Sequence, residues 1–187
     1  PELLQSAEEV RQAYSERHAF AASYSPSIEI TKRVQKAIQA GFTSGEPVGS
    51  IIDRVEAIGK WTRAYADTVV QTNVTTAYAA GRLREAARMA DLGLIAALQF
   101  KSVLQPTTRP NHAAAHGLIA AVDDPIWDRL SPALGYQCRC ALFPIDKNQI
   151  PRHLFRADGR LRRAAVPAGA FADLPEFGRR PDRGIYG

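Results

Sequence analysis

The stretch that decides the fold is residues 101–145, KSVLQPTTRPNHAAAHGLIAAVDDPIWDRLSPALGYQCRCALFPI. An apolar run enters it, a proline-opened turn carries His112 and His116, and it closes on a Cys-Arg-Cys segment at 138–140. The stretch holds both cysteines, two of the four histidines and one of the two tryptophans of the 187-residue chain. We therefore expect any chemistry of this chain to lie here.

In and around this stretch the apolar spacing is that of strands. Three short strands are predicted, over residues 94–104, 118–122 and 138–145. Between them, Pro110 opens a short helix over 111–116, and Asp124-Pro125 opens another that carries Trp127. The second half of the chain is therefore expected to form a small, mainly antiparallel sheet with short helices.

The first half of the chain has helical spacing throughout. Helices are predicted over residues 5–24, 26–40, 47–58 and 61–92. Gly41 is expected to end the second helix, with a loop over 43–46, and Gly59 to break or kink the chain after the third. The expected fold class is α+β, with a helical N-terminal half, the small sheet and an irregular basic C-terminal arm.

The longest helix presents two different faces. The face expected to be core carries Val70, Val74, Ala77, Tyr78 and Gly81, spaced by three and four residues. The other side carries a second set: Thr72, Thr75, Thr76 and Arg82. Glycine on the apolar face suggests the close approach of another element, because glycine costs a helix interior about 1 kcal/mol relative to alanine.

Composition and charge exclude several classes of protein. Hydrophobic residues make up 45% of the chain, which favours a sizeable core over disorder. No apolar run reaches the roughly 18 residues of a membrane-spanning helix, and no secretion signal is visible. Two cysteines separated by one residue make no disulfide framework, so a reducing setting is expected. The chain begins at Pro1, and we expect a preceding segment to be missing.

The net charge of +5 is concentrated at the C-terminal end. Residues 152–187 hold eight arginines against four acidic residues. The arginines, candidates for contact with DNA or an acidic partner, are Arg152, Arg156, Arg160, Arg162, Arg163, Arg179, Arg180 and Arg183. A solvated tail is the alternative. This arm is expected to be extended and packed on the body by Phe155, Leu161, Phe171, Phe177 and Tyr186.

The histidines and cysteines allow a metal site or a nucleophile. A complete tetrahedral zinc set could be formed by two His four residues apart on a helix and two Cys on one side of a strand. These residues are His112, His116, Cys138 and Cys140. Against this, Cys-x-Cys is tighter than the usual spacing, so small buried thiols and hydrogen-bonded imidazoles are favoured. A cysteine nucleophile with His112 as base, its thiol activated by Arg139, is the next alternative. No metal or other cofactor is therefore expected.

Three arginines in ordered apolar surroundings, Arg82, Arg109 and Arg139, are predicted to bridge to backbone carbonyls or carboxylates. Trp127 and Tyr136 flank a Pro-Gly loop, where core packing is favoured over ligand stacking. Together these features favour a scaffold over an enzyme.

Several segments, in this order, resemble the phage Mu F-like minor head protein family. They are Gln71-Thr72-Asn73 with residues 77–82 (AYAAGR), residues 108–114 (TRPNHAA) with Gly117, residues 123–127 (DDPIW), residues 134–140 (LGYQCRC) and the end, 181–187. The positions that the resemblance marks as structural are Thr72, Tyr78, Gly81, Arg82, Arg109, Pro110, His112, Gly117, Trp127, Gly135, Cys138, Arg139 and Cys140. Three positions depart from the family pattern: Gln105 and His116 replace acidic residues, and Thr107 replaces an arginine.

The resemblance implies a minor capsid protein of a tailed phage or prophage. Such a protein docks on the portal or inner capsid face and aids DNA packaging or delivery, in the virion and, during assembly, in the host cytoplasm. Its partners would be the portal, the major capsid protein or both, and packaged double-stranded DNA. No membrane, small-molecule substrate or catalysis is implied. The alternative is a metal- or cysteine-dependent enzyme, such as a nuclease, centred on His112, His116, Cys138 and Cys140.

On this basis the chain divides into three expected parts. N-terminal helices occupy residues 1–60, a Mu F-like core occupies 61–150, and the extended Arg/Pro/Gly-rich arm occupies 151–187.

Overall fold

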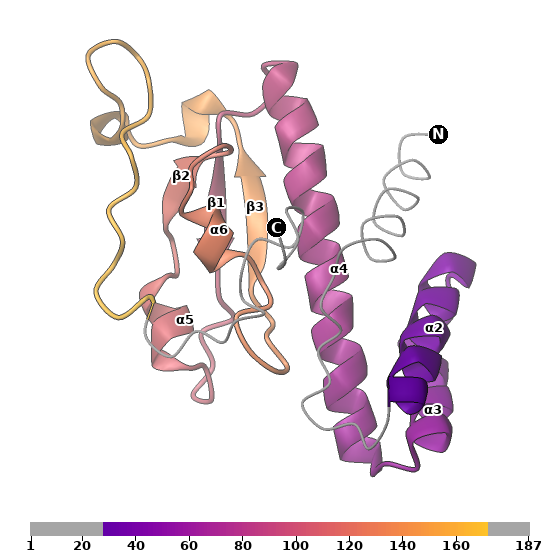
Figure 1. The fold of residues 1–187 in the computed structure, drawn as a ribbon. Helices are drawn as coiled ribbons and strands as arrows, with labels where there is room; N and C mark the ends of the chain where they lie inside the picture. The colour runs from indigo at the N-terminus through magenta and orange to yellow at the C-terminus, as the bar shows by residue number, and fades with distance from the viewer. Residues whose placement is uncertain (1–27, 172–187) are drawn as a thin grey trace.

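The computed structural model describes residues 28–171 (Figure 1). Three helices, α2 (Ile28–Ser44), α3 (Val48–Gly59) and α4 (Arg63–Asp91), precede a three-stranded antiparallel sheet with short helices. This confirms the α+β class with a helical first half. The helix expected over 5–24 lies outside the described residues. No helix within 28–171 combines the length and the apolarity that a membrane crossing requires.

Helix α2 runs three residues beyond the end predicted at Gly41, so the expectation of a loop over 43–46 was wrong at its first two positions. The hydroxyls of Thr43 and Ser44 donate to the carbonyls of Gln39 and Ala40, at 2.9 and 3.0 Å, which extends the helix. Gly45, with φ of 67°, then takes the left-handed position that ends it.

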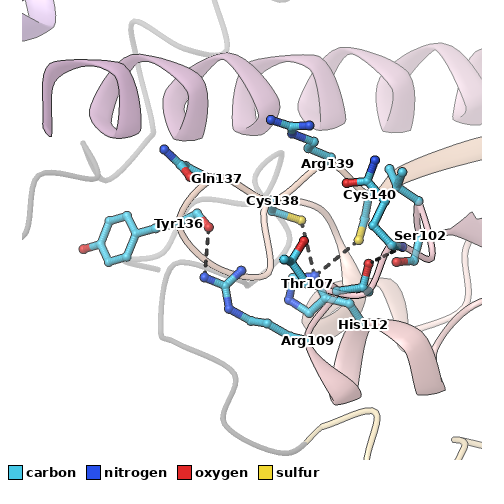
Figure 2. Close-up of a pocket in the computed structure, with 12 residues that line it drawn as sticks. Ser102, Thr107, Arg109, His112, Tyr136, Gln137, Cys138, Arg139 and Cys140 are labelled. Carbon is cyan, nitrogen blue, oxygen red and sulfur yellow. Dashed lines mark hydrogen bonds between the residues drawn. The ribbon is translucent and has the colours of Figure 1, made fainter. Parts of the chain in front are cut away.

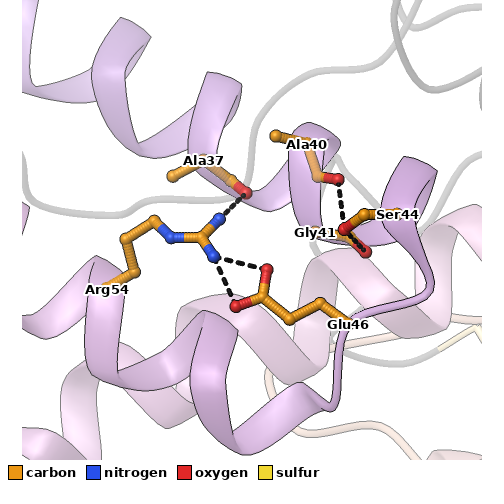
Figure 3. A network of polar contacts seen from close by, with 6 residues as sticks. All are labelled: Ala37, Ala40, Gly41, Ser44, Glu46 and Arg54. Atoms are coloured by element: carbon orange, nitrogen blue, oxygen red, sulfur yellow. Dashed lines mark hydrogen bonds and ion pairs between the residues drawn. The ribbon is translucent and has the colours of Figure 1, made fainter.

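Gly41 instead serves the packing of α2 on α3. A Cβ at this position would come within 2.5 Å of Cγ1 of Ile51, so only glycine allows this approach. Arg54 of α3 donates to the Ala37 carbonyl of α2 at 3.3 Å and forms an ion pair with Glu46 in the connecting turn (Figure 3). The two helices are therefore joined by an apolar contact and a charged one.

The break predicted at Gly59 is confirmed. Helix α3 ends there, and Lys60 adopts the left-handed conformation with φ of 52°. The ring of Trp61 lies against Gly59, where a Cβ would be 2.4 Å from Cδ2 of the indole. Helix α4 begins after Thr62, whose side chain accepts a hydrogen bond from the Tyr65 amide.

The sheet has the order β2-β1-β3, with β1 (Ala97–Lys101) at its centre. The partners are β2 (Ile119–Ala121), which pairs Leu98 with Ala120, and β3 (Ala141–Ile145), which pairs Leu98 with Pro144. All three strands are shorter than predicted. Because a strand extends only as far as its neighbours pair with it, the apolar residues at 94–96 and 102–104 lie outside β1.

Short helices connect the strands much as expected. Helix α5 (Pro110–Ala114) has its proline at the first helical position, and α6 (Trp127–Leu130) follows Asp124-Pro125. Two 3₁₀ turns follow β3, namely η1 (Lys147–Gln149) and η2 (Arg152–Leu154). The cysteine segment 138–140 precedes β3 as irregular chain, so the strand expected to begin at 138 begins at 141.

Helix α4 lies between the α2–α3 pair and the sheet (Figure 1), and it contributes to an apolar cluster with each of them. Its first half packs with α2 and α3 through residues such as Val69, Val70 and Ala77. Its second half packs on the sheet through Leu83 and Ala86. The division of the chain at 60/61 and 150/151 stays a prediction.

The prediction of which face of α4 is buried was partly wrong. Val70 and Ala77 are buried, whereas Tyr78 is 66% exposed. Thr72, placed on the opposite side, is fully buried because the irregular segment 131–140 covers it and its hydroxyl is hydrogen bonded.

The described part of the arm follows the body with little regular structure, as expected. Phe155 and Leu161 form an isolated bridge, and Phe171 packs against the cluster that includes the sheet. The guanidinium of Arg129 lies 3.8 Å from the centre of the Phe171 ring, and Ala170 is fully buried. The remaining anchors expected at Phe177 and Tyr186 lie outside the described residues.

The packing of α4 on the sheet generates a first prediction. Leu83→Ala should lower the free energy of unfolding of the 187-residue chain by about 2–5 kcal/mol, because it empties a fully buried position. Leu92→Ala is the matched control: that leucine is 70% exposed, and its loss should change stability by less than about 0.5 kcal/mol. Equal midpoints in urea for the two variants would contradict this packing.

Candidate functional site

A pocket of about 360 Å³ lies where the β1–α5 connection, α5 and the segment 131–140 meet (Figure 2). Its lining residues are Ser102, Val103, Gln105, Thr107, Thr108, Arg109, His112, Tyr136, Gln137, Cys138, Arg139 and Cys140. Segments distant in the sequence therefore meet at one cavity. Three of the four residues proposed for a metal set line it.

Three buried residues of the lining, His112 and the two cysteines, lie in contact with one another, and we call them the floor of the pocket (Figure 2). The ring is buried at 3% exposure, and its Nδ1 lies 3.8 Å from Sγ of Cys138 and 3.4 Å from Sγ of Cys140. The other ring nitrogen, Nε2, lies 3.4 Å from the Leu134 carbonyl. Because a carbonyl only accepts, this contact places the proton on Nε2 and leaves the lone pair of Nδ1 facing the thiols.

The two thiols form a coupled pair. The hydrogen bond with the Cys140 side chain, helped by His112 and opposed by burial, lowers the pKa of the Cys138 thiol to about 4. The same hydrogen bond, with burial and the charge of its neighbour, raises the pKa of Cys140 above its ordinary value. The contact between the two thiols therefore moves their pKa values in opposite directions.

His116 is not part of this group, so the four-residue set considered from the sequence is not assembled. Its side chain is exposed, and its Nδ1 lies 3.1 Å from the amide and 3.0 Å from the carbonyl of Ser102. A spacing of four on a regular helix predicts rings on one side, but α5 ends at Ala114, so the spacing no longer applies at His116.

The hydroxyls of α4 hold the cysteine segment, a feature that the sequence analysis missed. Thr75 donates to the Cys138 carbonyl at 3.0 Å, and Thr72 accepts from the Gln137 amide at 3.2 Å. The Gln137 side chain reaches Thr68 at 2.9 Å, and its backbone is left-handed, with φ of 54°. The available signal was the recurrence of threonines at helical spacing on the side of α4 opposite the face expected to be core.

Two of the three arginines contact backbone carbonyls as expected. Arg82 donates to the Leu142 carbonyl at 3.1 Å, with its guanidinium 5.3 Å from the centre of the Phe143 ring. Arg109 donates to the Tyr136 carbonyl at 3.1 Å. Arg139 is exposed and lines the pocket.

The remaining motif residues shape the backbone around the site. Gly117 adopts φ of 83°, a conformation that favours glycine. Gly135 lies beneath the guanidinium of Arg109, where a Cβ would come within 3.4 Å of Cζ. Trp127 is fully buried and donates from Nε1 to the Ala121 carbonyl at 2.8 Å, which places it in the core rather than in the pocket. Gly81 is half-buried on α4.

The contact between α4 and the cysteine segment generates a second prediction. Thr75→Val should lower the free energy of unfolding by about 1–3 kcal/mol, because the Cys138 carbonyl loses its hydroxyl partner. It should also speed the reaction of the thiols with a small alkylating reagent. Thr76→Val is the control, since among residues 28–171 the Thr76 hydroxyl donates to the Thr72 carbonyl of its own helix. Identical urea midpoints and alkylation rates would show that Thr75 does not hold this segment.

Comparison with known proteins agrees with the motifs. A protein of Escherichia phage Mu named capsid assembly protein F is 28% identical over 129 residues, covering 59% of this chain and 29% of the Mu protein. The Mu-like prophage FluMu F protein of Haemophilus influenzae is 23% identical over 179 residues, covering 84% of this chain and 43% of that protein. The chain thus spans less than half the length of these curated relatives. No solved structure is significantly similar to it.

A family model gives the firmest assignment. The model described as Phage Mu protein F like protein matches residues 32–143, from α2 through the site to β3. That match includes Thr72, Arg109, His112 and both cysteines, and it covers more than half of the chain. The chain belongs to the phage Mu F-like protein family.

Proposed function

We propose that this chain is a minor head protein of a tailed phage or prophage, acts in capsid assembly and docks on the portal or the inner capsid face. The observation that carries the proposal is the family match over residues 32–143, together with a relative named capsid assembly protein F. Its location is then the virion, after passage through the host cytoplasm during assembly. Its partners are capsid components, either the portal or the major capsid protein.

The geometry of the site supports a structural role. Thr75, Arg82 and Arg109 direct their polar atoms at carbonyls of the chain itself. None of the described residues lining the pocket carries a carboxylate, and the ring of His112 is oriented by the Leu134 carbonyl. The described lining therefore offers no carboxylate oxygen for a hard divalent ion such as Mg²⁺ at a phosphate. We therefore favour assembly over catalysis.

The arm supports a second element of the proposal, contact with packaged DNA or with an acidic partner surface. Its five described arginines, Arg152, Arg156, Arg160, Arg162 and Arg163, are all exposed. The tight 156–160 turn, closed by the Arg156 amide on the Arg160 carbonyl at 2.7 Å, places two of them near each other. Clustered guanidinium groups suit phosphate or carboxylate partners.

A third prediction concerns the particle. A tagged copy of the chain should copurify with assembled heads, and deletion of its coding sequence should yield particles that are misassembled or lack DNA. Measurement is by mass spectrometry of gradient-purified particles and by electron microscopy of the deletion lysate. Absence of the chain from particles, combined with normal heads on deletion, would refute the assembly role.

A fourth prediction concerns the arm. Replacing Arg152, Arg156 and Arg160 by glutamine should lower the slope of log affinity for duplex DNA against log salt by up to about 3, roughly one for each phosphate contact removed. Substitution is preferred to truncation of the arm, because truncation would also remove Ala170, which belongs to the core. The control, K32Q/R33Q/K36Q on exposed positions of α2, removes the same charge. If both triple variants reduce the slope equally, net charge alone explains the binding.

A further inference from the structure

We propose that His112, Cys138 and Cys140 bind one zinc ion. These three residues are buried, and one donor atom of each lies within 4.8 Å of the other two. The donor set, one imidazole nitrogen and two thiol sulfurs, is of the soft type that zinc selects. The inference does not depend on the capsid role, since it rests on side-chain geometry alone.

The distances match those of a tetrahedral zinc site. With zinc–sulfur bonds of about 2.3 Å and zinc–nitrogen bonds of about 2.0–2.1 Å, tetrahedral angles place nitrogen and sulfur about 3.6 Å apart. The observed separations from Nδ1 of His112, 3.4 and 3.8 Å, bracket this value. The same bond lengths put the two sulfur atoms about 3.8 Å apart, and all the donor atoms lie within 4.8 Å of one another, so the sulfurs are in reach of one ion.

The surroundings prepare the ligands for a metal. The Leu134 carbonyl accepts a hydrogen bond from Nε2 of His112, so the ring presents an unprotonated Nδ1 toward the sulfur atoms. Asn111 accepts from the His112 amide at 2.9 Å, and Thr75 fixes the Cys138 carbonyl. An outer shell that orients the first-shell donors is a regular property of metal centres in proteins.

The fourth position of the ion would face the pocket. The pocket is lined by the same three ligands and by the polar side chains Thr107, Arg109 and Arg139, so a water molecule fits there. Bound in this way, zinc links α5 to the segment 131–140, which is itself fastened to α4 by Thr72 and Thr75. Its role is to fasten three elements that share little regular hydrogen bonding.

The test starts from the 187-residue chain purified with a phosphine reductant and without chelator. Elemental analysis should find one zinc ion per chain, and removal by EDTA should lower the melting temperature, with zinc restoring it. Replacement by cobalt should produce the sulfur-to-cobalt charge-transfer absorption and the intense visible bands of a tetrahedral site. These measurements need no substitution, so they decide the question even if a ligand variant does not fold.

Ligand variants then locate the ion. Cys138→Ser, Cys140→Ser and His112→Gln should each lose the bound zinc, whereas His116→Gln, an exposed histidine four residues away, should keep it. Zinc-free protein with no cobalt–thiolate absorption and a melting temperature unaffected by EDTA would overturn the proposal. So would zinc retained in the three ligand variants, because the ion would then be held elsewhere.

Discussion

The structure depends on how a buried irregular segment satisfies its backbone. Residues 131–140 contain neither helix nor strand, yet most of them are buried. Each buried carbonyl or amide without a partner would cost about 1–3 kcal/mol, and the segment itself supplies little more than the Cys138 amide on the Gly135 carbonyl, so further partners come from outside it. Helix α4 supplies the hydroxyls of Thr72 and Thr75, and the α5 region supplies Arg109 and the ring of His112.

This constraint explains the two-sided character of α4. One side buries Val69, Val70 and Ala77 against α2 and α3, which needs only apolar surface. The opposite side meets backbone groups, which apolar side chains cannot satisfy, and threonine combines a hydroxyl with a methyl group in a small volume. The Thr72 hydroxyl bonds its own helix at Thr68 and also accepts from Gln137, so it can be fully buried without an unpaired atom.

The same contacts explain why some features could be predicted from the sequence and others could not. Capping residues, prolines and apolar spacing act locally, so the helices, the break at Gly59 and the presence of a small antiparallel sheet could be anticipated. The burial of Thr72, the exposure of Tyr78 and the separation of His116 from the thiols depend on residues more than 10 positions away along the chain or on where a short helix stops. The two thiols do lie on one side, since both sulfur atoms contact Nδ1 of His112, although no strand forms at 138–140.

The departures from the family pattern acquire a physical meaning from the same geometry. His116, which the resemblance places where relatives have an acidic residue, contacts the backbone of Ser102 and leaves the donors of His112 and the two cysteines untouched. Gln105 and Thr107 line the pocket above those donors. In the described lining, Arg109 and Arg139 carry the permanent charges. The floor of the pocket therefore keeps its three donors, while its entrance favours a neutral or anionic occupant.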